Sequence, residues 1–147
     1  MQQLRLIAFG NPSEVVELST VPVPSLGEDD VLVSMEAAPL NPSDFLLIRG
    51  MYGVRPSLPF PPGSEGVGRV TKTGSMVDVA LQDRRVLILP TYEQGTWADQ
   101  AVVPVRNIVS MSDEADPVQL SMIGINPATA YLLLSQYVRL MPGDWIG

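Results

Sequence analysis

The chain has 147 residues and a formal charge of -7, from 9 basic and 16 acidic side chains, and it contains no histidine and no cysteine. A metal site built from Cys or His, thiolate or imidazole catalysis and disulfide bonds are therefore excluded. The basic residues form no run that could follow a phosphate backbone, so a nucleic-acid partner is not expected.

Length and hydropathy indicate a globular protein without a membrane segment. The hydrophobic content is 46%, which suits one packed domain, or one domain with the beginning of a second. No apolar stretch approaches the roughly 20 residues that cross a bilayer. Residues 1–9 alternate like a strand and lack the profile of a signal peptide, so a cytoplasmic location is expected.

Strand-like segments dominate the chain. Glycine occurs 12 times and proline 14 times, which indicates many short elements joined by turns. β-branched or alternating runs predict strands at 3–9, 15–18, 31–38, 65–71, 85–90, 96–103 and 107–110. This pattern is typical of a mainly β protein, a barrel or a sandwich.

Three helices are each predicted by a short polar residue followed by proline, the preferred pair at a helix start. They begin at Asn41-Pro42, Asp116-Pro117 and Asn126-Pro127; the first is expected to stop at Gly50 and the last near Val138. Beyond them, a turn is predicted at 141–144 and the start of an apolar strand at 145–146. The chain is therefore expected to end at the beginning of a second unit.

The longest loop, 50–63, carries a candidate catalytic residue. A long loop inside a compact domain is usually functional. Tyr52 lies in its permissive half, and its hydroxyl can donate a proton or a hydrogen bond, with an ordinary pKa near 10. From the residues alone, a surface tyrosine without a catalytic role is the favoured alternative.

The glycine cluster at Gly63, Gly66 and Gly68 resembles a dinucleotide fingerprint only superficially. Its spacing differs from G-x-G-x-x-G, and it leads into a strand, whereas that fingerprint opens a helix. A turn followed by a strand is the better interpretation. Glu65 lies within it, and a carboxylate among apolar residues must be paired, so an ion pair with an arginine or a place in a site are the alternatives.

Two further positions have both a structural and a functional interpretation. Asn126 and Thr129 begin the last predicted helix, where they either cap it or hold an amide or phosphate of a ligand. Trp97 is most simply an aromatic residue of a strand.

The order of several motifs resembles the medium-chain dehydrogenases/reductases. Within that superfamily the chain is most similar to the zinc-free 2-enoyl thioester reductases, which act on enoyl-CoA or acyl-carrier-protein substrates, and next to the quinone oxidoreductases. The motifs are Asn41-Pro42-Ser43-Asp44, Gly50-x-Tyr52, Pro59 to Gly63, Ser64-Glu65-Gly66-Val67-Gly68, Gly95-Thr96-Trp97, Asn126-Pro127-x-Thr129-Ala130-Tyr131 and Pro142-Gly143-Asp144-Trp145.

The resemblance implies a GroES-like β-barrel followed by a Rossmann domain, with NADPH between them. Tyr52 matches the tyrosine regarded as catalytic, and Asn126 matches an asparagine that contacts NADPH. Asn41 and Thr129 would line the nicotinamide side, and Trp97 would lie near the acyl pocket. The zinc-dependent relatives have cysteine at the position of Asn41 and histidine at that of Ser64, so no metal is expected here.

The implied reaction is hydride transfer to the β-carbon of an enoyl thioester and protonation of the α-carbon. The resemblance divides the chain into a GroES-like domain at 1–125 and, at 126–147, a linking helix and the start of a truncated Rossmann domain. It implies a homodimer for the full-length form and an isolated chain without activity. A quinone or alkenal reductase and a non-catalytic module that binds a partner chain are the alternatives.

One segment departs from the family pattern. Relatives commonly have glycine before the aspartate of the turn at Gln82-Asp83-Arg84-Arg85, where this chain has glutamine. A changed turn with little functional consequence is expected.

Overall fold

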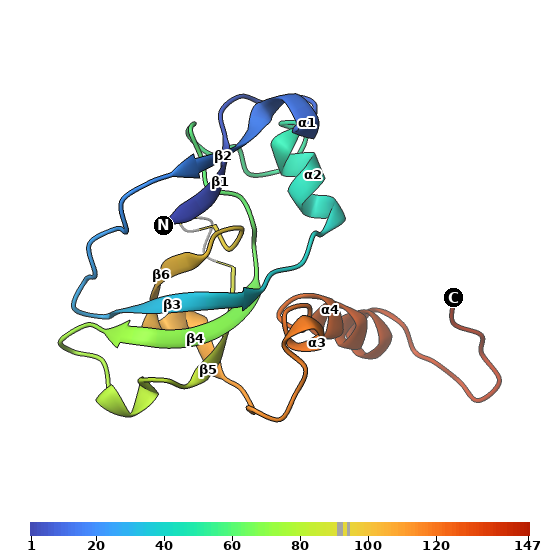
Figure 1. Ribbon diagram of the computed structural model, residues 1–147. Helices are drawn as coiled ribbons and strands as arrows, with labels where there is room; N and C mark the ends of the chain where they lie inside the picture. Colours follow the sequence, from blue (N-terminus) through green and yellow to red (C-terminus); the bar gives the residue numbers. More distant parts are fainter. Residues whose placement is uncertain (91–92, 94) are drawn as a thin grey trace.

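The structure is a computed structural model that describes residues 1–90, 93 and 95–147. Two antiparallel sheets dominate it: a two-stranded sheet of β1 and β2, and a five-stranded sheet in the order β6-β3-β4-β5-β7 (Figure 1). The strands are β1 (Gln2–Leu6), β2 (Val16–Thr20), β3 (Asp30–Ala37), β4 (Gly66–Thr73), β5 (Arg85–Ile88), β6 (Gln100–Pro104) and β7 (Ile108–Ser110). The predicted mainly β fold is confirmed.

Short helices connect and flank the sheets. They are α1 (Pro12–Val15), α2 (Pro42–Ile48), α3 (Pro117–Leu120) and α4 (Asn126–Leu132), with single turns η1 (Val79–Leu81) and η2 (Val105–Asn107) and a wider turn η3 (Leu133–Tyr137) that continues α4. Figure 1 shows α1 and α2 beside the small sheet, whereas α4 and the C-terminal segment extend away from the strands.

The main core lies on one face of the five-stranded sheet. Val33 of β3 pairs with Val70 of β4 and with Ala101 of β6, and all three side chains are buried. Because alternate residues of a strand share a face, the valines of β3, β4 and β6 form one continuous apolar cluster.

A second cluster supports the small sheet. Leu6, Val15, Leu47 and Ile48 are buried together, with Phe60 and other aromatic side chains packed against them. Leu6 and Phe60 exchange backbone hydrogen bonds of 2.8 and 3.0 Å, so the loop after α2 is fixed to β1. This cluster positions α2 and the long loop beside each other.

All seven predicted strands are present, and two of them are clearly shorter than predicted. β1 ends at Leu6, before the bend at residues 8–10. Residues 96–99 precede β6 and bond to β1 instead, where Leu4 donates to the carbonyl of Trp97 and Asp99 donates to that of Gln2. The sequence prediction also missed α1, which begins with an asparagine-proline pair, Asn11-Pro12, as α2 does. A helix of 4 residues leaves too little apolar periodicity to be distinguished from a turn.

The helix starts are also largely as predicted. Asn41 and Asp116 cap α2 and α3. Ile125, not Asn126, occupies the capping position of α4, so the predicted cap at Asn126 is wrong by one residue. The 145–146 segment forms no strand, because no neighbouring strand of the described chain pairs with it.

In the turn before β5, Asp83 adopts an unusual backbone conformation. Asp83 has φ of 61°, a left-handed conformation that glycine and, less readily, aspartate and asparagine adopt. Gln82 is the residue that differs from the family pattern, but it needs no positive φ. The substitution is therefore compatible with this turn.

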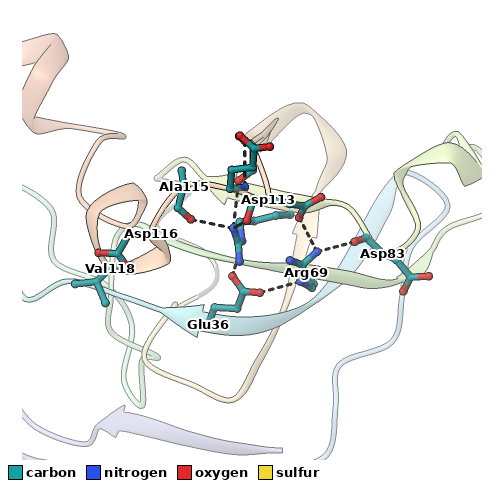
Figure 2. Close-up of polar contacts among 10 residues, drawn as sticks. Glu36, Arg69, Asp83, Asp113, Ala115, Asp116 and Val118 are labelled. Atoms are coloured by element: carbon teal, nitrogen blue, oxygen red, sulfur yellow. Dashed lines mark hydrogen bonds and ion pairs between the residues drawn. The ribbon is translucent and has the colours of Figure 1, made fainter.

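A charge network fastens the segment after β7 to the sheet (Figure 2). Arg69 and Arg85 face each other across β4 and β5, an arrangement that would be repulsive alone. Glu36 lies at a bulge in β3 and binds both guanidinium groups, at 2.9 Å and 2.7 Å. Arg85 also donates to the carbonyl oxygens of residues 112, 113 and 115, at 3.2, 2.9 and 3.0 Å. These bonds fix the path of the chain toward α3.

Candidate functional site

A cavity of about 280 Å³ lies between α2, the long loop and the start of α4. α2 contributes Ser43, Asp44 and Leu47, and the loop contributes Tyr52 and Phe60. The remaining lining residues are Pro62, Gly63, Ser64, Pro90 and Ile125. A mostly apolar hollow with a few converging polar groups is typical of a small-molecule site.

Tyr52 is half-buried and lines this cavity. Gly50 supplies the positive φ, 70°, with which the loop leaves α2, and Phe9 packs against it. The guanidinium of Arg55 lies 4.5 Å from the centre of the Phe9 ring, which holds the loop on the small sheet. Within the described part of the chain the Tyr52 hydroxyl has no hydrogen-bond partner, so it is available to a ligand.

Asp44 forms part of the polar wall of the cavity. Its carboxylate accepts a hydrogen bond from the backbone N–H of Asn41 at 2.8 Å and from the Ser64 hydroxyl at 3.4 Å. Burial raises the pKa of Asp44, and the two hydrogen bonds offset only part of this effect. Sequence analysis named Asp44 only as part of the Asn41-Pro42-Ser43-Asp44 motif.

This raised pKa predicts a pH-dependent stability. At pH values between the ordinary pKa of 3.8 and the higher pKa in the folded state, the folded state binds more protons than the unfolded state. The stability of the fold therefore falls as the pH rises through this range. We expect Asp44→Asn to remove this loss, so that the wild type becomes less stable relative to the variant between pH 4 and 7. Thermal unfolding across that range measures it. Ser64→Ala removes a hydrogen bond that lowers the pKa of Asp44, so stability should then fall over a wider range of pH. A difference in stability between the wild type and Asp44→Asn that stays constant with pH would contradict the prediction.

Asn41 and Glu65 bind each other in the interior. Glu65 has no exposed surface, and the Asn41 amide nitrogen Nδ2 donates to its Oε1 at 3.0 Å. The predicted ion pair between Glu65 and an arginine is therefore wrong, because α2 brings an amide to this carboxylate instead. Asn41 does not line the cavity, although its neighbours Ser43 and Asp44 do.

Trp97 is not among the residues that line the cavity. Its indole N–H donates to the carbonyl of Pro39 at 3.0 Å, and its ring packs on the cluster around Leu6. Gly63, with φ of 96°, lines the cavity and lies so close to Trp97 that an added Cβ would be 2.7 Å from the indole ring. The position of Trp97 near an acyl pocket therefore stays a prediction.

Asn126 and Thr129 are exposed and also lie outside the cavity lining. The Thr129 hydroxyl donates to the carbonyl of Ile125 at 2.9 Å, the structural interpretation considered above. Ile125 itself lines the cavity, so the start of α4 reaches the hollow while the two polar side chains point to solvent. Ser43, Ser64 and Phe60 are lining residues that sequence reasoning missed, although all three lie in the quoted motifs or beside the loop prolines.

The described residues contain no group of three or more Asp, Glu, His or Cys side chains that could hold a metal ion. None of their helices has the length and apolarity needed to cross a membrane.

The structure is thus a mainly β domain with a cavity between a helix and a proline-rich loop. Residues 27–113 match the alcohol dehydrogenase GroES-like domain, and the chain belongs to this family. The resemblance to medium-chain dehydrogenases/reductases is thereby confirmed.

Relatives extend the likeness beyond the matched residues. The chain is 37% identical to the mouse mitochondrial enoyl-[acyl-carrier-protein] reductase over 145 residues and 39% identical to one from Caenorhabditis elegans over 140. These matches cover 97% and 94% of the chain but only 39% and 40% of the relatives, so the chain spans about two fifths of their length.

A solved structure supports the same fold. The quinone oxidoreductase from Thermus thermophilus, determined also with NADPH, is 30% identical with a TM-score of 0.75. The match covers 90% of this chain and 39% of that one.

Proposed function

We propose that these residues form the substrate-side part of an NADPH-dependent 2-enoyl thioester reductase. The observation that carries the proposal is the unpartnered Tyr52 hydroxyl at an apolar cavity, in a chain that has no cysteine or histidine to supply another acid. The enoyl-reductase relatives favour the substrate class, an enoyl thioester of CoA or acyl carrier protein.

The reaction requires a proton donor and a stabilised oxyanion. If NADPH is bound, it would supply the hydride that adds to the β-carbon of the substrate. The resulting enolate would take a proton at its α-carbon, and Tyr52, which lines the cavity, would donate that proton from its hydroxyl. The hydroxyl of Ser43 and the apolar surfaces of Leu47 and Phe60 would orient the acyl chain and exclude water.

The cofactor residues belong to the same proposal. The Asn126 side chain is exposed and makes no hydrogen bond within the described residues, so its amide remains free to contact a nicotinamide nucleotide. Thr129 and Asn41 would lie on the nicotinamide side, with Asn41 limited to the groups that Glu65 leaves free. The hydrogen-bonding groups of Asn126, Thr129 and Asn41 therefore fit an uncharged carboxamide better than a pyrophosphate, which needs more donors.

Exposed apolar side chains in the last helix and the segment after it favour the presence of a second, nucleotide-binding unit. Tyr131, Leu133 and Trp145 are 68%, 54% and 98% exposed. Such an apolar surface is typical of one covered by another domain or subunit. We propose that 126–147 links the GroES-like domain 1–125 to a Rossmann domain, and that the complete protein is a homodimer.

Reduction of crotonyl-CoA by NADPH, followed at 340 nm, tests the proposal. We expect turnover by the complete protein and none by residues 1–147 alone. A complete protein that reduces a quinone but not crotonyl-CoA would favour the second candidate, a quinone oxidoreductase, which the Thermus thermophilus structure supports. Absence of both activities, with no NADPH binding, would favour a non-catalytic module.

A further inference from the structure

Glu65 is a buried carboxylate with one unused oxygen. It opens the segment that leads into β4, has no exposed surface, and its backbone carbonyl is fixed by the Thr96 hydroxyl at 2.7 Å. Oε1 accepts from Asn41, but Oε2 has no hydrogen-bond partner in the described part of the chain. A buried acceptor without a donor is costly, so this oxygen needs an explanation.

The unused oxygen faces the turn that begins α4. A Cβ added to Gly124 would lie 2.7 Å from Oε2 and 3.6 Å from the Leu89 side chain. Only glycine therefore allows the backbone to approach the carboxylate this closely. The backbone N–H groups of 124–126 make no hydrogen bond in the described structure, so unsatisfied donors lie on the same turn.

We propose that Glu65 is a positioning residue that joins the start of α2 to the start of α4. Oε1 holds the Asn41 carboxamide, and Oε2 accepts an N–H from the turn at 124–126 when that turn closes on it. The turn carries Ile125 into the cavity wall and immediately precedes Asn126. Closing it would fix both residues relative to Tyr52. For its effect on NADPH this inference rests on the proposed function.

Glu65→Gln in the complete protein tests the role of Oε2. Glutamine has the same size, and its amide oxygen can still accept from Asn41, but its NH₂ group then faces the backbone donors of the turn. We expect the dissociation constant for NADPH, measured by fluorescence titration, to rise about tenfold or more, which corresponds to roughly 1.4 kcal/mol. The KM for NADPH should rise more than kcat falls.

A second readout does not depend on the cofactor. Amide hydrogen exchange at residues 124–130 should become at least about threefold faster in Glu65→Gln without NADPH, while β3 and β4 remain protected. Gly124→Ala should act in the same direction, because its Cβ keeps the turn away from Oε2. Gly53→Ala, where an added Cβ meets nothing within 4 Å, is the matched control for exchange and thermal stability.

A different set of results is expected if Glu65 has no positioning role. If Oε2 merely remains unpaired, replacing the carboxylate by an amide should leave exchange and NADPH affinity unchanged and raise the melting temperature. That outcome would overturn the role of Glu65 without affecting the proposed function. A wild-type protein that does not bind NADPH would reject the proposed function, while the exchange experiment would still decide the role of Glu65.

Discussion

Tyr52→Phe in the complete protein is expected to lower kcat for crotonyl-CoA reduction by about 10- to 10,000-fold, the range spanned by general-acid catalysis. The phenylalanine ring retains the contacts with the cluster around Leu6 and Leu47, and the substitution removes only the hydroxyl of this cavity-lining residue. The loss should therefore appear in kcat, with little change in the KM for NADPH. Steady-state kinetics with both substrates varied measures it.

Quinone reduction and the melting temperature of Tyr52→Phe serve as controls. Quinone reduction needs no protonation of a carbon atom, so any such activity should survive the substitution. The melting temperature should also change little, because the hydroxyl makes no hydrogen bond within the described structure. An enoyl reductase activity within about threefold of the wild type would refute a proton-donating role for Tyr52.

Arg85→Met is expected to cause the largest loss of stability among these substitutions, about 3 kcal/mol. The Arg85 side chain is 9% exposed and binds Glu36 and three backbone carbonyl oxygens of the segment that leads to α3. Methionine has a similar apolar stem, so the packing is kept and the hydrogen bonds are lost. Urea unfolding should show a lower midpoint with an unchanged slope.

Neighbouring arginines provide the comparison. Arg84 is exposed, and Arg84→Met should change the free energy of unfolding by no more than about 0.5 kcal/mol. Arg85→Lys should recover part of the loss, since a lysine keeps the charge but cannot reach Glu36 and three carbonyls together. Equal midpoints for the Arg84 and Arg85 variants would show that the network contributes nothing measurable.

Local signals in the sequence were sufficient for most of the fold. The apolar runs predicted β3, β4 and β5, because their valines and isoleucines are buried on sheet faces where β-branched residues pack well. Asparagine or aspartate before proline predicted α2, α3 and α4, since the capping preference and the fixed φ of proline act within a few residues. The same signal at Asn11 was overlooked because α1 is so short.

The sequence by itself also determined which chemistries are impossible here. Without histidine or cysteine, a zinc site of the dehydrogenase type cannot form. This conclusion depends on residue identity alone.

Only the tertiary structure decided which side chains meet. The partner of Glu65 is Asn41, 24 residues away, and not an arginine. The packing of α2 against the loop brings Tyr52, Asp44 and Ser64 to one cavity, whose lining does not include Trp97. Contacts between distant segments arise from how the two apolar clusters assemble, and composition, periodicity and capping carry no information on that assembly.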